Sequence, residues 1–294
     1  MKREDIFKEL TYRKKILEEK GYYVIYIGLY GSQNYNLDDE ESDIDVKAII
    51  LPSLHDIIFR KVTSTTIECE NGNIDVKDLL TFYEVIRKGN FSYIEAMQTE
   101  YSIGDKYIKE LFSNIKVNLK SFVGAMYEKR KALTHEYPSK TKEFEKWGFD
   151  PKQHHHILRL YDILRYITDN DCNMSFIKYD DNDEKRKFLI DTKRNKMGSQ
   201  KNSVELASDY AIEVAKTLIP DDYKYEPIDL SEEVYKYIED KLRLELSNTP
   251  TVSAREVRTF DNGIPKKDLA MFPELEKYKD KDISYIIYSS LSIL

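Results

Sequence analysis

The sequence predicts an α/β (α+β) fold, in which an N-terminal domain built on a mixed sheet precedes a mostly helical C-terminal domain. Three observations support this prediction. Runs rich in β-branched and aromatic residues, which are typical of strands, fall within the first third of the 294-residue chain. Amphipathic helical patterns separate some of these runs, and from about residue 105 onward helical spacing dominates. Because chains of this length usually form two domains, we place them at 1–115 and 116–294.

The first elements follow from residue spacing. Apolar residues recur at helical intervals over residues 4–19, which predicts an amphipathic helix that ends near Gly21. Residues 22–30 are rich in β-branched and aromatic side chains and predict the first central strand. A second strand is predicted over residues 43–51, where Pro52 ends it.

A hairpin should follow a short helix over residues 54–60. Residues 63–70 are enriched in β-branched side chains, and Asn71-Gly72 is a strong hairpin turn signal. Residues 74–76 begin the returning strand, which brings Asp75 close to the two strands that precede it.

Helices should then replace strands. Residues 78–87 predict an amphipathic helix stopped by Gly89, and Asn90 is placed to cap the next helix, which contains Glu95. Asp150-Pro151 predicts a helix start, with Asp as the N-cap, and that helix runs to about Asp169. Residues 171–202 predict a surface loop, with a mobile segment or a nucleic-acid contact as alternatives. The remaining predictions are helices over 203–218 and 231–246, a long loop over 247–265 and an apolar end at 283–294.

Composition limits the class of protein. Hydrophobic residues make up 41% and charged residues 34%, which is typical of a soluble globular protein. The net charge of −7 argues against broad, sequence-blind binding of double-stranded DNA, because such binding needs many Lys and Arg contacts with phosphates. A local basic groove for tRNA or a nucleotide stays compatible with this charge.

The sequence shows no apolar run of the length that a membrane span requires, and its charged N-terminus does not resemble a signal peptide. Cys69 and Cys172 match no zinc spacing, so we expect free thiols and a cytoplasmic protein.

A pair of carboxylates is the strongest chemical signal. Asp43 and Asp45 stand at i and i+2 at the start of a predicted strand, so their side chains point to the same face. Two acids aimed at one point repel each other unless a cation lies between them. Hard oxygen ligands of this kind suit Mg²⁺ or Mn²⁺. The acidic run at residues 38–41 lacks the alternation of a calcium loop, and we interpret it as a solvated loop.

The stretch from Gly31 to Asp45 resembles the active-site signature of the nucleotidyltransferase superfamily named after DNA polymerase beta. That signature is Gly-Ser, a spacer of about ten residues, and Asp-x-Asp on a strand. Further matches resemble a bacterial and phage branch of predicted nucleotidyltransferases of unassigned substrate. They are Lys88-Gly89-Asn90 with Glu95 five residues on, and Phe149-Asp150-Pro151-Lys152 leading into His156-x-x-Arg159. The resemblance covers roughly residues 20–165.

The resemblance implies roles for particular residues. Asp43 and Asp45 would bind two Mg²⁺ ions that bridge the triphosphate of an NTP, and Asp75 would be the third metal-site carboxylate, close to the acceptor hydroxyl. Gly31 and Ser32 would contact the phosphates of the nucleotide.

One departure concerns the turn after Gly-Ser. Relatives usually carry a second glycine there, whereas this chain has Asn36. Asn is among the few residues that tolerate positive φ, so we expect the turn to form.

A cationic stripe is predicted on the helix that begins at Pro151. Lys152, His156 and Arg159 stand at i, i+4 and i+7 and therefore share one face, which would hold a triphosphate or form a solvated surface. The three consecutive histidines 154–156 cannot close on one metal ion, because adjacent helical residues point about 100° apart. For Glu95, contact with substrate or metal and a purely structural role both stay open.

These observations lead to three functional hypotheses. The first is an enzyme that transfers a nucleoside monophosphate from an NTP to a hydroxyl of RNA (including tRNA), a protein or a small molecule, with Mg²⁺ or Mn²⁺ as cofactor. The second is a nucleotide-binding or regulatory module without catalysis. The third is an antitoxin-like protein that acts by binding a partner protein.

Overall fold

The computed structural model describes residues 3–40, 42–138, 141–170, 178–248, 256–260 and 283–287. It forms two compact units, residues 1–238 and 239–294. The first unit holds an N-terminal five-stranded mixed sheet followed by a mostly helical region, which confirms the predicted fold class. The predicted domain boundary at residue 115 falls inside this unit and stays a prediction.

The sheet has the strand order β3-β4-β2-β1-β5. Its members are β1 (Val24–Tyr30), β2 (Asp45–Ile50), β3 (Ser64–Cys69), β4 (Gly72–Asp78) and β5 (Ser102–Gly104). β2 and β4 are parallel, and the other neighbours are antiparallel. The predicted hairpin is confirmed at β3 and β4, where Gly72 has a φ of +111°.

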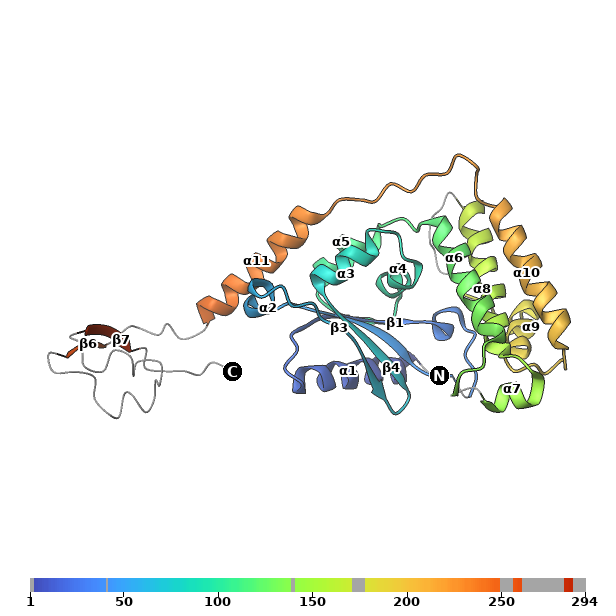
Figure 1. Cartoon of the computed structure of the whole chain (residues 1–294), viewed down its shortest axis with the longest axis horizontal. Coiled ribbons are helices and arrows are strands. Elements are labelled where there is room, and N and C mark those ends of the chain that lie inside the picture. The colour runs from blue at the N-terminus through green and yellow to red at the C-terminus, as the bar shows by residue number, and fades with distance from the viewer. Residues whose placement is uncertain are drawn as a thin grey trace. The chain divides into compact units, whose positions relative to one another are not determined.

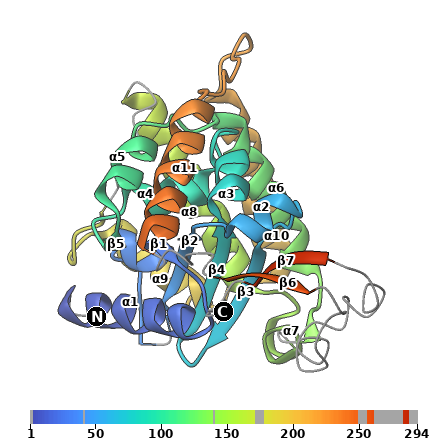
Figure 2. The same cartoon turned by 90° about the vertical axis from the view of Figure 1, so that its left-hand side faces the viewer.

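The two faces of the sheet have different partners (Figures 1 and 2). Helix α1 (Arg3–Glu19) covers one face, and its Leu10 and Leu17 pack against apolar residues that alternate along β1, β2 and β4, such as Ile27 and Val46. The other face carries Asp45, because side chains alternate along a strand. The helices on that face are α3 (Leu79–Ile86), α4 (Phe91–Gln98) and α5 (Lys106–Ser113).

Helix α4 lies unusually close to the sheet. Gly28 is in the middle of β1, and a Cβ there would meet the Ala96 carbonyl oxygen at 2.3 Å. The hydroxyl of Tyr26, two residues earlier, donates a hydrogen bond to the same oxygen at 2.8 Å. Glycine at position 28 therefore allows the backbone of α4 to rest directly on β1.

Helices α3 and α4 have side-chain N-caps, of which the one at Asn90 was predicted. Asp78 caps α3 through the Thr81 N–H, and Asn90 caps α4 through the Ser92 N–H. The predicted cap at Asp150 is also confirmed, with Pro151 opening α8.

The helical region packs α6, α8, α9 and α10 against one another. Its helices are α6 (Leu119–Thr134), α7 (Thr141–Trp147), α8 (Pro151–Asp169), α9 (Glu184–Lys193) and α10 (Lys201–Thr217). The predicted loop over 171–202 is wrong at α9, and residues 171–177, including Cys172, lie outside the described residues. Only Leu189, Thr192 and Lys193 of α9 are buried. The charged sequence of α9 therefore lacks the apolar residues at helical spacing from which a helix is predicted.

The described residues also form α2 (Leu54–Ile58), α11 (Ser231–Asn248) and the hairpin of β6 (Glu256–Phe260) with β7 (Ile283–Ile287). The predicted long loop over 247–265 is therefore wrong at β6 and at the end of α11. The other residues of that loop, and residues 288–294 of the apolar end, lie outside the described residues. None of the helices within the described ranges has both the length and the hydropathy to cross a bilayer.

Candidate active site

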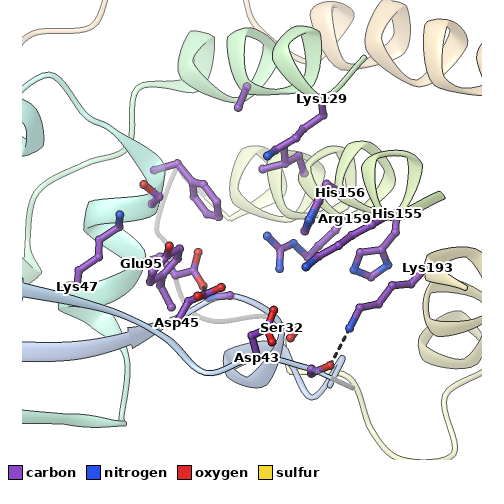
Figure 3. Close-up of a pocket in the computed structure, with 18 residues that line it drawn as sticks. Ser32, Asp43, Asp45, Lys47, Glu95, Lys129, His155, His156, Arg159 and Lys193 are labelled. Carbon is purple, nitrogen blue, oxygen red and sulfur yellow. Dashed lines mark hydrogen bonds between the residues drawn. The ribbon is translucent and has the colours of Figure 1, made fainter. Parts of the chain in front are cut away.

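A cavity of about 430 Å³ lies in the first unit, between the end of the sheet and the helical region. One wall comes from β1, β2, the turn between them and α4, and the other comes from α6, α8 and α9 (Figure 3). Seven of the eight predicted site residues line it, namely Gly31, Ser32, Asp43, Asp45, Lys152, His156 and Arg159.

The carboxylate pair stands at the rim of the sheet. Asp45 is the first residue of β2, and Asp43 precedes it by two positions, so both side chains reach the cavity. The Asn73 N–H donates a hydrogen bond to Asp45 Oδ1 at 3.1 Å. No side chain in the described part of the chain pairs with the carboxylate of Asp43, which is exposed. The pair therefore keeps most of its oxygen lone pairs free toward the cavity.

The positions of these acids depend on a buried arginine. Arg13 of α1 is fully buried and donates hydrogen bonds to the carbonyl oxygens of Asn73 at 3.0 Å and Asn71 at 2.8 Å. Asn73 in turn supplies the N–H that holds Asp45. Helix α1 thus fixes the start of β4 and, through it, one of the two carboxylates.

The Gly-Ser turn is held by Glu95. Gly31 has a φ of +99°, and its N–H donates to Glu95 Oε1 at 2.5 Å. Asn34 Nδ2 donates to the same oxygen at 3.2 Å. Burial raises the pKa of Glu95, although the charge of Arg159 opposes this shift. Glu95 is therefore structural as well as part of the cavity wall, and the Gly31 amide is already engaged by this carboxylate. Ser32 opens the short 3-10 helix η1 (Ser32–Tyr35) and lines the cavity.

Asn36 closes this turn in the left-handed conformation, with φ of 60°, as its tolerance of positive φ predicts. Its Nδ2 also donates to the Tyr179 carbonyl oxygen at 2.8 Å and to Asp181 at 2.9 Å. A glycine would keep the backbone conformation but lose both contacts, so Asn36 ties the turn to the segment before α9.

Asp75 is the one predicted site residue that does not line the cavity. It lies on β4 directly beside Lys47 of β2, on the same face of the sheet as Asp45. Its Oδ2 accepts hydrogen bonds from Lys47 Nζ at 2.8 Å and from the Tyr93 hydroxyl at 2.7 Å. Burial alone would raise the pKa of Asp75, but these partners and Lys77 lower it. Lys47 was not predicted from the sequence. Its side chain lies on the same face of the strand as Asp43 and Asp45, so the alternation that selects the two acids would also have selected Lys47.

The opposite wall is cationic. Lys152, His156 and Arg159 share one face of α8, as their spacing predicts, and Lys129 of α6 and Lys193 of α9 extend this face (Figure 3). The two additional lysines were missed for different reasons. Lys129 lies in a charged helix with no distinguishing pattern, and Lys193 belongs to a basic run that we interpreted as a surface loop.

Several nitrogens on this wall have no partner. Nε and Nη1 of Arg159, Nδ1 of His156 and Nε2 of His155 are buried and make no hydrogen bond within the described residues. Arg159 is only 7% exposed, and its guanidinium lies 5.1 Å from the centre of the Tyr35 ring. Buried polar groups without partners are costly, so their presence in one cavity indicates a missing anionic or hydrogen-bonding ligand.

The histidines are held neutral by their surroundings. Burial lowers the pKa of His154 to about 4 and of His155 to about 3, and it lowers the pKa of His156 well below its usual value, with Arg159 adding to the last two shifts. His154 pairs with the Ser208 hydroxyl at 2.7 Å, outside the cavity. His155 and His156 both line the cavity, and His155 also pairs with the Leu189 carbonyl oxygen at 2.8 Å.

Hydrogen bonds join the loop that precedes Asp43, on the acidic wall, to the end of α9, on the basic wall. Lys193 Nζ donates to Ser42 Oγ at 2.7 Å, and Arg194 donates to both oxygens of Asp39 at 2.8 and 2.9 Å. Burial alone would raise the pKa of Asp39, but Arg194, Ser42 and Lys193 hold it well below its usual value. The loop that leads to Asp43 is thus anchored on the end of α9.

The donor set suits one kind of metal. Within the described residues, no group of three or more His, Cys, Asp or Glu side chains converges on a point. Mg²⁺ is commonly bound by one or two carboxylates together with substrate phosphates and water. Asp43 and Asp45, opposite a wall suited to phosphates, fit that arrangement and would hold such an ion.

Comparison with protein-family models and with curated proteins finds no match for this chain.

Proposed function

We propose that this protein is a metal-dependent nucleotidyltransferase, which moves a nucleoside monophosphate from an NTP to an acceptor hydroxyl and releases pyrophosphate. The observation that carries the proposal is the pairing of opposite walls in one cavity. Asp43 and Asp45 face a cationic surface on which Arg159 and His156 present buried nitrogens without partners. A magnesium-bound triphosphate supplies both the cation that the acids lack and the anion that the nitrogens lack.

Different residues of the cavity bind different parts of the NTP. Lys152, Arg159 and Lys193 neutralise the triphosphate, and His156 offers Nδ1 to one of its oxygens. Phe91, Ala125 and Leu160 are the apolar residues of the same cavity and receive the base. A volume of about 430 Å³ falls within the range of small-ligand sites.

The chemistry rests mainly on positioning and charge. The acceptor oxygen bonds to the α-phosphorus while the bond from that phosphorus to pyrophosphate breaks. A bound divalent ion would neutralise the charge that develops on the phosphate oxygens. Asp75 acts in this proposal as a positioning residue, because it fixes the ammonium of Lys47 at the cavity wall.

The test is nucleotide transfer with Mg²⁺ or Mn²⁺ and each labelled NTP, with and without total RNA and cell lysate. The wild type should label RNA, protein or a small molecule, and Asp43→Ala/Asp45→Ala should not. Glu18→Ala/Glu19→Ala removes the same charge from the exposed end of α1 and should behave as wild type. Transfer that persists in the Asp43/Asp45 variant would refute the proposal.

A second candidate function follows from Asp75. Because its carboxylate is held by Lys47 and Tyr93, the site presents two free acids where the resemblance implies three. This favours, as the alternative, a nucleotide-binding module that regulates a partner without catalysis. Calorimetry together with the transfer assay separates the two functions, since such a module binds NTP and Mg²⁺ in calorimetry and transfers no label to any acceptor, whereas the enzyme does both.

A further inference from the structure

A second hollow, of about 290 Å³, adjoins the cavity and shares Lys152 and Lys193 with it. Helix α7, which precedes α8 along the chain (Figure 1), contributes Lys142, Lys146 and Trp147 to its lining. We call this hollow the groove; its two shared lysines place it next to the site of proposed transfer.

Positive charge dominates this groove. Its lining includes five cationic side chains and two carboxylates, and two of the cations, Lys193 and Arg194, are already paired with Asp39. Asp150, one of the two acids, caps α8 and accepts hydrogen bonds from the Lys152 N–H at 3.0 Å and from Gln153 at 2.9 Å. Lys142 and Lys146 are exposed and have no acidic partner within the described residues. Their ammonium groups are available to anions that enter along α7.

An aromatic ring lies among these charges. Trp147 is half-buried, and its inner side packs against Leu133, Phe149 and Val204. The Nζ of Lys146 lies over the ring, 4.5 Å from the ring centre. Lys146 therefore covers this face of the indole, and because its side chain is exposed it can move aside and leave the ring to a stacked base.

We infer that this groove binds the end of a single-stranded nucleic acid and that the terminal hydroxyl of that strand is the acceptor. The inference rests on the proposed function. A flat ring flanked by cations is the combination that binds single strands, since bases stack on the ring and phosphates pair with the lysines. An acidic peptide would match the charges and leave the ring unused. The small volume and the net charge of −7 disfavour a duplex.

The reaction balances without a further reagent. The terminal hydroxyl oxygen of the strand bonds to the α-phosphorus of the NTP, the bond to pyrophosphate breaks, and the hydroxyl proton passes to water. The product is a strand longer by one nucleotide, and the groove would hold the nucleotide next to the reacting end.

The sole tryptophan of the chain reports on this groove directly. The full-length protein is titrated with a twelve-nucleotide single-stranded RNA, its DNA equivalent, the matching duplex and an oligoglutamate peptide. Indole fluorescence should fall with either single strand, because a stacked base quenches it. On single strands each phosphate contact adds about 0.7 to the magnitude of the slope of log affinity against log salt. Lys142→Ala/Lys146→Ala removes two such contacts and should therefore lower that magnitude by about 1.4. Trp147→Leu should weaken binding about tenfold or more, measured by anisotropy of a labelled strand.

Lys8→Ala/Lys15→Ala is the matched control, because it removes two exposed lysines from α1 and should change neither measurement. Melting curves of each variant show whether it is folded. The inference is overturned if no single strand binds, if the groove variants bind as wild type, or if the peptide or the duplex binds more tightly. Calorimetry with NTP and Mg²⁺ is run on the same wild-type sample. NTP binding without strand binding refutes the groove alone, and the absence of NTP binding refutes the proposed function.

Discussion

At the scale of single residues, Arg159 combines burial with unused hydrogen-bonding capacity. Arg159→Met should reduce affinity for NTP and Mg²⁺ by about ten- to a hundredfold, because hydrogen bonds to charged groups contribute about 1.5–3 kcal/mol. The melting temperature of the free protein should stay the same or rise, since the variant removes a buried charge that lacks a full set of partners. Calorimetry and thermal melting measure the two effects.

Arg165→Met provides the control on the same helix. Its side chain is 60% exposed and lies 3.9 Å from Asp169, so it should alter neither affinity nor melting. A structural role for Arg159 would give the opposite pattern, with a lower melting temperature and unchanged affinity.

His154 gives stability a dependence on pH. Its pKa is about 4 in the folded protein and about 6.5 in the unfolded chain, so the unfolded state binds the proton first as pH falls. The free energy of unfolding should therefore drop by about 2 kcal/mol between pH 7 and pH 5 from this residue alone. His154→Gln still offers Ser208 a hydrogen-bond partner but cannot bind the proton. In urea titrations, the free energy of unfolding of this variant should therefore fall less between pH 7 and pH 5 than that of the wild type, by the amount that His154 contributes. Equal pH dependence in both proteins would contradict the assignment.

Residue spacing predicted part of the cavity and not the rest, for physical reasons. Helical and strand periods place Asp43, Asp45 and Arg159 on the correct faces, because these periods are local properties. They do not show that Lys47 forms an ion pair with Asp75, since that contact depends on the register of two strands separated by a hairpin. Nor do they show that Lys193 reaches the cavity.

At the scale of elements, α1 and the β3–β4 turn are joined by Arg13. Arg13→Met should lower the free energy of unfolding by about 3–5 kcal/mol, because Glu9 and two carbonyl oxygens lose their buried partner. It should also weaken metal-dependent NTP binding, because Asn73 no longer holds Asp45 in place. Urea unfolding and calorimetry test the pair of effects. Lys15→Met, on the exposed side of α1, is the control and should cost little.

Prediction of the elements succeeded where one face is buried throughout. Strands β1 and β2 and helix α8 contain continuous apolar patterns, and their ends carry clear signals such as Asp150-Pro151. Helix α9 was missed because it buries little apolar surface, and its position depends on contacts with the turn at Asn36 and Asp39.

At the scale of the whole molecule, the cavity joins the sheet to the helical region within the first unit. NTP with Mg²⁺ at a hundred times its dissociation constant should stabilise the protein by about 2.7 kcal/mol. Because the ligand contacts both walls, hydrogen exchange should slow in β2 and in α8 together. Protection confined to one wall would show that the ligand does not bridge them. Asp43→Ala/Asp45→Ala should show neither the stabilisation nor the shared protection.

The residues that line this cavity are spread widely along the chain, from Tyr30 to Lys193. During translation, the strands and α4 leave the ribosome well before α8 and α9 exist. At about 5–20 residues per second, the ribosome needs roughly 5–20 seconds to pass from Glu95 to Lys193. Until Lys152 is added, a nascent chain carries both acids and none of the α8 and α9 cations opposite them. The wall opposite the two acids is thus completed only after the sheet has had time to fold.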